Sequence, residues 1–278
     1  MHPYLMAKAA DAHRDELFRQ AASARLATSA RKRRRQARTV ATPPDQLDIH
    51  DLGTVLGVWA HPDDEAYLSA ALMAEARDAG HPVVVATATP GQAGGDGDVR
   101  SRELTRSLAA VGVREHHYLG FEDGHCAAVP AEVGMAAVLR LLRQVRPDTI
   151  LTFGPDGMTG HPDHVAVSGW VHRAWQATGY RGRLFHATLN ESFHRQWGPL
   201  SAETGIWMPG AVPPSVPDDT VTLHVSVTGV TAERKLAALR AHASQTDALR
   251  GRVGDTTFRE WWGAESFVQV APVEVLAA

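Results

Sequence analysis

The chain has 278 residues and is 44% hydrophobic, which suits one large α/β domain or a domain with a smaller appendage. Its net charge of −3 is unevenly spread: residues 1–40 carry ten basic and three acidic residues, a balance of +7, so the remainder carries −10. An acidic body argues against nucleic-acid binding, no apolar run is long enough to span a membrane, and a single cysteine excludes an intramolecular disulfide.

These features predict a cytoplasmic protein. Cys126 is either a small buried hydrophobe, which we favour, or a metal ligand. The basic run at residues 31–35 lacks the apolar segment that follows in a secretory signal. Arginine far outnumbers lysine and alanine is abundant, which is typical of GC-rich bacterial genomes.

Residues 1–50 are expected to form a helical, basic extension followed by a linker. The stretch 3–38 is rich in alanine and arginine and has only a weak apolar stripe, and Pro43 and Pro44 mark the linker. We favour a solvated or docking helix over a patch for nucleic acid or an anionic surface, because no aromatic residues interleave with the arginines.

Residues 51–183 alternate between strand-like and helical segments. Strands are predicted at 54–59, 82–88, 115–119 and 149–153, and helices at 65–79, 99–111, 131–145 and 163–178. This alternation predicts an α/β fold: a Rossmann-like, mostly parallel sheet with helices on both faces. The glycine-rich segment 90–98 lacks the Gly-Lys-Ser/Thr of a phosphate loop and is expected to be a mobile lip.

Residues 184–278 are expected to form a smaller C-terminal α+β lobe that completes the substrate site. Its predicted elements are strands at 184–189 and 220–227, a helix at 231–249 with Thr231 as N-cap, and a last strand within 256–270. A loop rich in proline and glycine at 205–219 is expected to lie over the site.

The first cluster of chemically active residues is His61-Pro62-Asp63-Asp64-Glu65, at the end of a predicted strand and the start of a helix. One turn of chain can aim His61 and Asp64 at a single point. Two adjacent carboxylates repel unless a cation lies between them or one is protonated. A bound metal resolves this, with Asp64 as ligand and Asp63 as general base.

The second cluster, His161-Pro162-Asp163-His164, occupies the equivalent position about a hundred residues later. If His164 completes the ligand set, the metal has three protein ligands and an open position, as in catalytic zinc sites. His161 would then lie close without ligating, with Asp163 hydrogen-bonded to its ring and favouring the imidazolium. The alternative is that each His-Pro-Asp is only good helix-capping chemistry. Two clusters at strand ends of one sheet favour the metal site.

Both clusters resemble the signature motifs of the PIG-L/LmbE-like zinc-dependent N-deacetylases. The resemblance rests on residues 60–65 and 160–167 and extends over about residues 53–250. Three further segments fit it: Arg100 with Glu103-Leu104, Leu119-Gly120 with Asp123-Gly124, and Lys235 with His242-Ala243-Ser244-Gln245.

The resemblance implies a Rossmann-like fold and hydrolysis of an N-acetyl group, usually on a glucosamine-type sugar. It implies that His61, Asp64 and His164 bind Zn²⁺, although another divalent transition metal is possible. It also implies that Asp63 is the general base that protonates the leaving amine, and that His161 stabilises the oxyanion with Asp163 tuning it.

Four further residues are candidates for substrate binding. Arg100 and Asp123 could hold substrate hydroxyls or an anionic group, although Arg100 could equally form a surface ion pair with Glu103. His242 could cap the site or be a packed helix residue. Thr159 stands where some family members carry a tyrosine that helps hold the oxyanion. The tryptophans form either a stacking wall for substrate or part of the core; they are Trp197, Trp207, Trp261 and Trp262.

Three functions follow from these residues. The first is a zinc-dependent N-deacetylase that acts on a small-molecule amino-sugar conjugate, with no nucleic-acid partner and no membrane span. The second is an amidase or deacylase for a larger amide, such as a thiol-sugar conjugate or a secondary metabolite. The third, a non-catalytic sugar- or nucleotide-binding module, is disfavoured because every residue needed for metal and base is present. The oligomeric state is not predicted.

Overall fold

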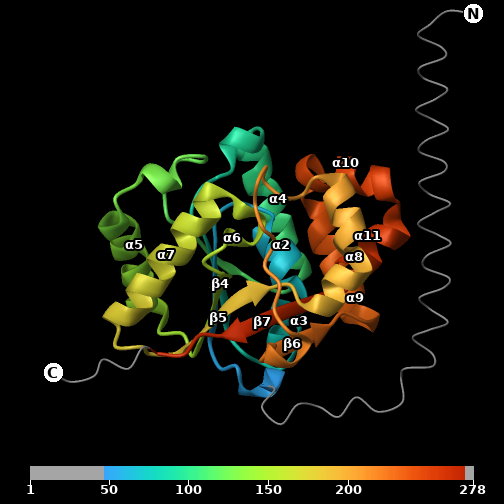
Figure 1. Ribbon diagram of the computed structural model, residues 1–278. Coiled ribbons are helices and arrows are strands. Elements are labelled where there is room, and N and C mark those ends of the chain that lie inside the picture. The colour runs from blue at the N-terminus through green and yellow to red at the C-terminus, as the bar shows by residue number, and fades with distance from the viewer. Residues whose placement is uncertain (1–46, 273–278) are drawn as a thin grey trace, which may run out of the picture.

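The computed structural model describes residues 47–272, which fold around one central sheet (Figure 1). The sheet has seven strands in the order β3-β2-β1-β4-β5-β7-β6. Five of these strands are parallel, namely β1 (Val55–Trp59), β2 (Val83–Thr87), β3 (Glu115–Tyr118), β4 (Thr149–Phe153) and β5 (Arg183–Thr188). The strand β7 (Ala264–Gln269) is antiparallel to both of its neighbours, β5 and β6 (Leu223–Ser226). The predicted Rossmann-like, mostly parallel α/β class is confirmed.

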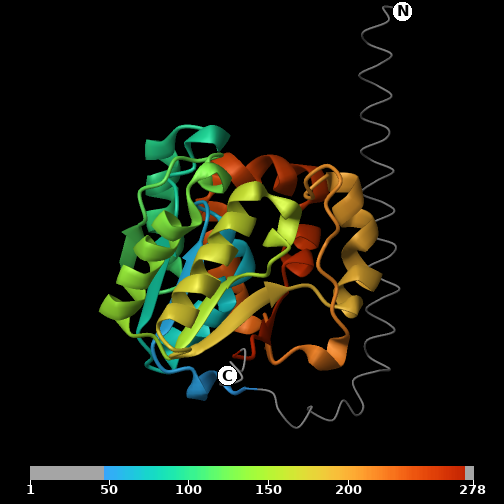
Figure 2. The same ribbon diagram turned by 60° about the vertical axis from the view of Figure 1, so that its left-hand side comes forward.

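Helices cover both faces of the sheet. On one face α5 (Ala131–Val145) packs against α7 (Pro162–Ala177). On the other face α9 (Gly229–Ala241) packs against α3 (Ala70–Asp78) and α4 (Gly97–Ala110) (Figures 1 and 2). The remaining helices are α2 (Asp64–Leu68), α6 (Gly157–Gly160), α8 (Glu191–Thr204), α10 (Ala243–Val253) and α11 (Asp255–Trp261). Short 3-10 turns lie at Ile49–Asp51, Gln92–Gly94, Cys126–Ala128 and Asp218–Thr220.

The strand order brings the His61–Glu65 and His161–His164 clusters to the same edge of the sheet. From β1 the order runs through β2 to β3 on one side and through β4 to β5 on the other. The boundary between β1 and β4 is therefore a topological switch point, where ligands bind beyond the carboxyl ends of the strands. All residues of β1 and β4 are buried, which fixes the two strand ends firmly in the core. The first cluster directly follows β1, and the second follows β4 after the short helix α6.

Two helices that the sequence predicts as continuous are each divided in two. The helix predicted at 65–79 breaks at Ser69, where φ is −146°, because the carboxylate of Glu265 accepts the amide N–H groups of Ala71 and Leu72 in the first turn of α3. The helix predicted at 231–249 breaks at His242, whose ψ of 50° is not helical. It also begins earlier than predicted, with Thr228 rather than Thr231 as N-cap.

The C-terminal residues share the sheet of the core. Strands β6 and β7 extend it beyond β5, and helix α8, which the sequence did not predict, follows β5. The division into domains at residue 183 stays a prediction. The extension at 1–50 lies outside the described residues except for its last four. Among the described residues, no helix is both long and apolar enough to cross a membrane.

Candidate metal centre

Two neighbouring strands deliver the first and last of the predicted ligands. His61 lies two residues beyond the end of β1, and Asp64 begins α2. His164 lies in the first turn of α7, which starts at Pro162 with His161 as N-cap. All three side chains are nearly buried, with exposed fractions of 6–8% for the residues. The fold therefore brings together groups that are 103 residues apart in the sequence.

The ligand-capable atoms of these residues form a compact triangle. Nδ1 of His61 lies 3.1 Å from Nε2 of His164. The Asp64 carboxylate completes the triangle through its two oxygens: Oδ2 lies 3.7 Å from His61 Nδ1, and Oδ1 lies 3.4 Å from His164 Nε2. Tetrahedral zinc with bonds of about 2.0–2.2 Å holds its ligand atoms about 3.4 Å apart. The spacing of the three side chains is close to this value.

A hydrogen bond to Nδ1 of His164 leaves Nε2 of that ring to face the predicted metal position. His164 Nδ1 lies 2.9 Å from the carbonyl oxygen of Gly157, so it donates its proton there and leaves Nε2 as a lone pair. Burial lowers the pKa of His164 to about 3, which keeps the ring neutral. Gly157 makes this possible, because its φ is +70° and a Cβ there would lie 3.1 Å from that of His164.

The outer nitrogen of His61 faces two carboxylates. Nε2 lies 3.0 Å from Asp123 Oδ1 and 3.3 Å from Asp163 Oδ2. Burial opposes a second proton on this ring, but the two carboxylates outweigh it and raise the pKa of His61 to about 10. A proton on Nδ1 would occupy the position that the metal needs, so metal binding at this nitrogen releases that proton.

Asp163 and Asp123 therefore act differently from their predicted roles. Asp163 does not hydrogen-bond the His161 ring through its carboxylate. Instead the carboxylate accepts the amide N–H groups of Gly124 and Cys126 and faces His61, because the loop after β3 packs over the start of α7. Asp123 likewise accepts the Ala93 amide and faces His61. Both carboxylates orient His61, a predicted ligand.

The predicted base, Asp63, has a strained backbone. Its φ of 126° and ψ of −30° are rarely adopted by an L residue, and such strain costs about 1–3 kcal/mol. Burial raises the pKa of Asp63 to about 7, the charge of Asp64 adds to this, and the guanidinium of Arg100 opposes it. Arg100 Nη2 lies 3.4 Å from Asp63 Oδ2. A carboxylate with a pKa close to neutrality is well suited to accept and return a proton.

His161 presents a neutral hydrogen-bond donor. The backbone N–H of Asp163 donates to its Nδ1 over 3.2 Å, so the ring proton lies on Nε2. Burial lowers its pKa, and the nearby His61 and His164 rings add to that. The imidazolium expected from the sequence is thus disfavoured, and Nε2–H is available to an oxyanion without a net charge. Ligand-capable atoms of His61, His161 and His164 also lie within 4.8 Å of one another.

A cavity of about 470 Å³ opens over these groups. Five residues of the two clusters line it, namely His61, Asp63, Asp64, His161 and His164, together with Ala93, Gly94, Arg100, Asp123, Thr159 and Gln245. Its apolar wall is formed by Tyr67, Leu68, Met158, Leu189, Ile206, Trp207, Leu249 and Trp262. The tryptophans are thus divided: Trp207 and Trp262 line the cavity, whereas Trp197 and Trp261 are buried in the core.

Comparisons with known proteins show the family to which this chain belongs. The family model for PIG-L, GlcNAc-PI de-N-acetylase, matches residues 56–175. A 1D-myo-inositol 2-acetamido-2-deoxy-alpha-D-glucopyranoside deacetylase of Thermobifida fusca is 30% identical over 240 residues, which cover 69% of this chain and 82% of that relative. The chain belongs to the PIG-L family.

Two further proteins are similar to this member of the PIG-L family. A deacetylase of Nakamurella multipartita with the same description is 33% identical over 243 residues, covering 72% of this chain and 82% of that protein. The crystal structure of the conserved protein TT1542 of Thermus thermophilus aligns with a TM-score of 0.58 and 22% identity, covering 82% of this chain and all of that one. The latter supports the fold alone.

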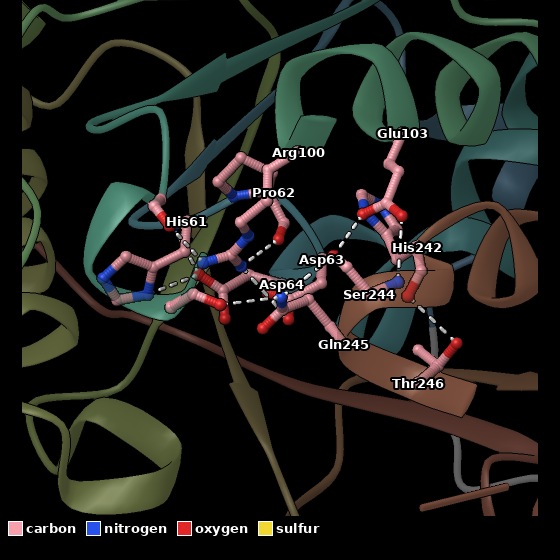
Figure 3. Close-up of polar contacts among 12 residues, drawn as sticks. His61, Pro62, Asp63, Asp64, Arg100, Glu103, His242, Ser244, Gln245 and Thr246 are labelled. Carbon is pink, nitrogen blue, oxygen red and sulfur yellow. Dashed lines mark hydrogen bonds and ion pairs between the residues drawn. The ribbon is translucent and has the colours of Figure 1, made fainter. Parts of the chain in front are cut away.

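Of the residues predicted to bind substrate, Thr159 and Arg100 line the cavity and His242 does not. Thr159 lines the cavity, with its hydroxyl 3.3 Å from His164 Nδ1. Arg100 also lines it, but it is buried and donates to the carbonyl oxygens of Gly91 and Pro62, so the surface ion pair with Glu103 is wrong (Figure 3). His242 is completely buried and is not among the lining residues.

His242 is a packed residue because its Nε2 lies 2.7 Å from Glu65 Oε1. Burial opposes charge on both groups, but their attraction outweighs it: the pKa of His242 is raised and that of Glu65 is lowered. No role was predicted for Glu65, although it directly follows Asp64, a predicted ligand. The lining residues Leu189 and Ile206 were also not predicted, because the sequence offered no signal for them beyond their place near the 205–219 loop.

Proposed function

We propose that this member of the PIG-L family is a zinc-dependent hydrolase that removes the acetyl group from an N-acetylated amino sugar in a small-molecule conjugate. The observation that carries the proposal is the triangle of His61, Asp64 and His164, with sides of 3.1–3.7 Å and the strained Asp63 beside it. Family membership and the deacetylase relatives support the same reaction.

The donor set suits zinc, since two imidazoles and a carboxylate leave one position open. A bound zinc would supply Lewis-acid polarisation of the acetyl carbonyl and would acidify water at the site. Asp63 takes a proton from the attacking water and returns it to the leaving amine nitrogen. His161 donates through Nε2–H to the developing oxyanion, which such a donor stabilises by about 3–4 kcal/mol. The products are acetate and the free amine.

The substrate class follows from the relatives. Their description names an N-acetylglucosamine joined to myo-inositol, and a cavity of about 470 Å³ has room for a substrate of that kind. Thr159, rather than a tyrosine, stands beside the second cluster, and its hydroxyl is engaged near His164. We therefore propose an N-acetylglucosamine conjugate, with the group attached to the sugar left open.

A second candidate is a deacylase or amidase for a larger amide. The observation that favours it is the apolar wall, in which Ile206, Trp207 and Leu249 come from the C-terminal part of the chain. Long acyl chains gain about 0.8 kcal/mol for each buried methylene group, so such a wall would select them.

One experiment separates these functions. The zinc-loaded protein is incubated with N-acetylglucosaminyl-inositol, with other N-acetylglucosamine conjugates and with N-octanoyl-glucosamine, and the free amine is measured. Release from the acetyl compounds supports the deacetylase, and release from the octanoyl compound alone supports the deacylase. Silence with all of them, in a protein that binds zinc, overturns both and favours a binding module.

Three predictions from the sequence remain proposals. A cytoplasmic location rests on the single cysteine, which is buried. The basic extension at 1–50 is proposed as a solvated or docking helix followed by a linker. Residues 51–183 are proposed as the catalytic core and residues 184–278 as a lobe that completes the substrate site, which agrees with the origin of much of the apolar wall.

A further inference from the structure

The backbone of Asp63 is held on every side by hydrogen bonds. The carbonyl oxygen of Pro62 accepts from Arg100 Nη2 at 2.6 Å. The carbonyl oxygen of Asp63 accepts the amides of Ala66 and Tyr67 in α2. The remaining group, the N–H of Asp63, donates to Oε2 of Glu65 at 3.0 Å. Of the bonds described, this one alone joins a side chain to a backbone group of Asp63 itself.

Glu65 is in turn held by residues from distant elements. Its Oε1 accepts from Ser107 of α4 and lies 2.7 Å from His242 Nε2, at the junction of α9 and α10. Glu65, Ser107 and His242 are all buried, with exposed fractions of 0–1%. Because these groups are buried, water cannot replace them as hydrogen-bond partners. The two carboxylate oxygens of Glu65 therefore make different contacts: Oε1 binds Ser107 and His242, and Oε2 accepts from the N–H of Asp63.

A second carboxylate fastens the same junction without touching Asp63. Glu103 of α4 accepts the Ser244 amide at 2.9 Å and the Ser244 hydroxyl at 2.6 Å (Figure 3). The Ser244 hydroxyl also accepts from Nε2 of Gln245, which lines the cavity. The Glu103–Ser244 contact therefore tests what fastening the junction contributes without the bond to Asp63. The Glu65–His242 contact tests stability together with the position of Asp63.

We propose that Glu65 and His242 are positioning residues, which hold the strained backbone of Asp63 so that its carboxylate faces the reacting atoms. The inference rests on the proposed function, because Asp63 must be the base for its position to matter. Neither residue touches the ligand triangle through its side chain, so zinc binding is not expected to depend on them.

The test compares Glu65→Ala, His242→Leu and His242→Gln with the control Ser244→Ala, each as zinc-loaded protein with N-acetylglucosaminyl-inositol as substrate. We expect kcat to fall about 10- to 100-fold in the first two variants, because a misplacement of about 1 Å has such effects, while KM changes less than about twofold. His242→Gln keeps a donor for Glu65 and should recover most of kcat. Ser244→Ala, which also frees Gln245 at the cavity wall, should lower Tm and change kcat less than about twofold.

Zinc content and amide hydrogen exchange are measured on the same variants. Zinc should remain at one equivalent per chain, and the Asp63 amide should exchange hydrogen faster in Glu65→Ala but not in Ser244→Ala. Full kcat in Glu65→Ala, or loss of zinc together with activity, overturns the inference. If Glu65→Ala does not fold, the comparison of His242→Leu with His242→Gln decides, and equal kcat in these two overturns it. A wild-type protein that binds zinc but releases no amine instead overturns the proposed function.

Discussion

Nδ1 of His61 and Nε2 of His164 face each other at 3.1 Å, while the other nitrogen of each ring faces a protein acceptor. Two imidazole nitrogens in this arrangement need a shared cation or proton between them. The relationship is local, but it depends on two strands that lie side by side only because the sheet reverses its order between β1 and β4. It leads directly to the first prediction.

Zinc should stabilise the metal-free protein, and the gain should require the ligand triangle. At a free zinc concentration 100-fold above Kd, the expected stabilisation is about 2.7 kcal/mol. That corresponds to a rise in Tm of about 5–10 °C for a protein of this size. Scanning calorimetry with and without zinc measures it. Asp64→Ala and His164→Ala should lose the shift, whereas His224→Ala, at an exposed position on β6, should keep it.

Asp63→Asn should separate metal binding from turnover. Loss of the general base is expected to lower kcat about 10²- to 10⁴-fold, because the asparagine amide cannot accept the proton. Zinc content by atomic absorption should stay at one per chain, since the triangle is untouched. A variant with turnover close to wild type would show that another group takes the proton.

The buried ion pair between Lys235 and Glu265 should stabilise the protein strongly. Nζ lies 2.6 Å from Oε1, and Lys235 also donates to the carbonyl oxygen of Tyr67. Lys235→Met leaves a buried carboxylate without its cation and should cost about 3–5 kcal/mol in urea unfolding. Lys235→Met/Glu265→Gln should cost less than the sum of the two single variants. Strict additivity would mean that the two charges do not stabilise each other.

Stability should fall as the solution becomes acidic, partly because of His186. Burial lowers the pKa of His186 to about 4, and His172 adds to this. The unfolded state, with a pKa near 6.5, takes up the proton first, so stability is lost as pH falls from about 6.5 to about 4. We expect about 1–2 kcal/mol, after allowance for partial exposure. His186→Gln should flatten the pH dependence of the urea midpoint, and an unchanged profile would contradict the assignment.

Trp207→Ala should weaken substrate binding more than chemistry. The ring lines the cavity, and loss of an aromatic stacking contact of about 0.5–1.5 kcal/mol should lower kcat/KM about 2- to 12-fold, mainly through KM. Trp197→Phe, in the core away from the cavity, serves as control and should leave KM unchanged. A loss confined to kcat would assign Trp207 to another role.

Much of the fold could be predicted from the sequence, because strands such as β1 and β4 read as short apolar runs followed by ligand-type residues. The family and the zinc chemistry also follow from the two motifs. The breaks at Ser69 and His242 could not be predicted, since their causes lie far away in sequence. Glu265, which caps the first turn of α3, is 194 residues from Ala71.

The roles of individual site residues also depend on contacts between residues that are far apart in the sequence. Local spacing suggested that Asp163 would serve the neighbouring His161, but the fold presents it to His61, 102 residues away. His242 looked like a candidate for the cavity because it belongs to a motif. Its burial against Glu65 depends on packing between α9, α2 and α4, and no local pattern encodes that. The predicted ligand set itself stays a prediction, with distances that suit it.

Helix α9 has a consequence for the order in which the protein matures. All three predicted ligands lie before residue 165, whereas the partner that anchors Glu65 and the pair that caps α3 come from residues 235–265. During synthesis the ligands emerge from the ribosome about seventy residues before Lys235. His242, which helps to hold Asp63 through Glu65, and the residues that cap α3 are therefore synthesised only after all three predicted ligands, so the backbone around Asp63 takes its final form after the ligand positions do.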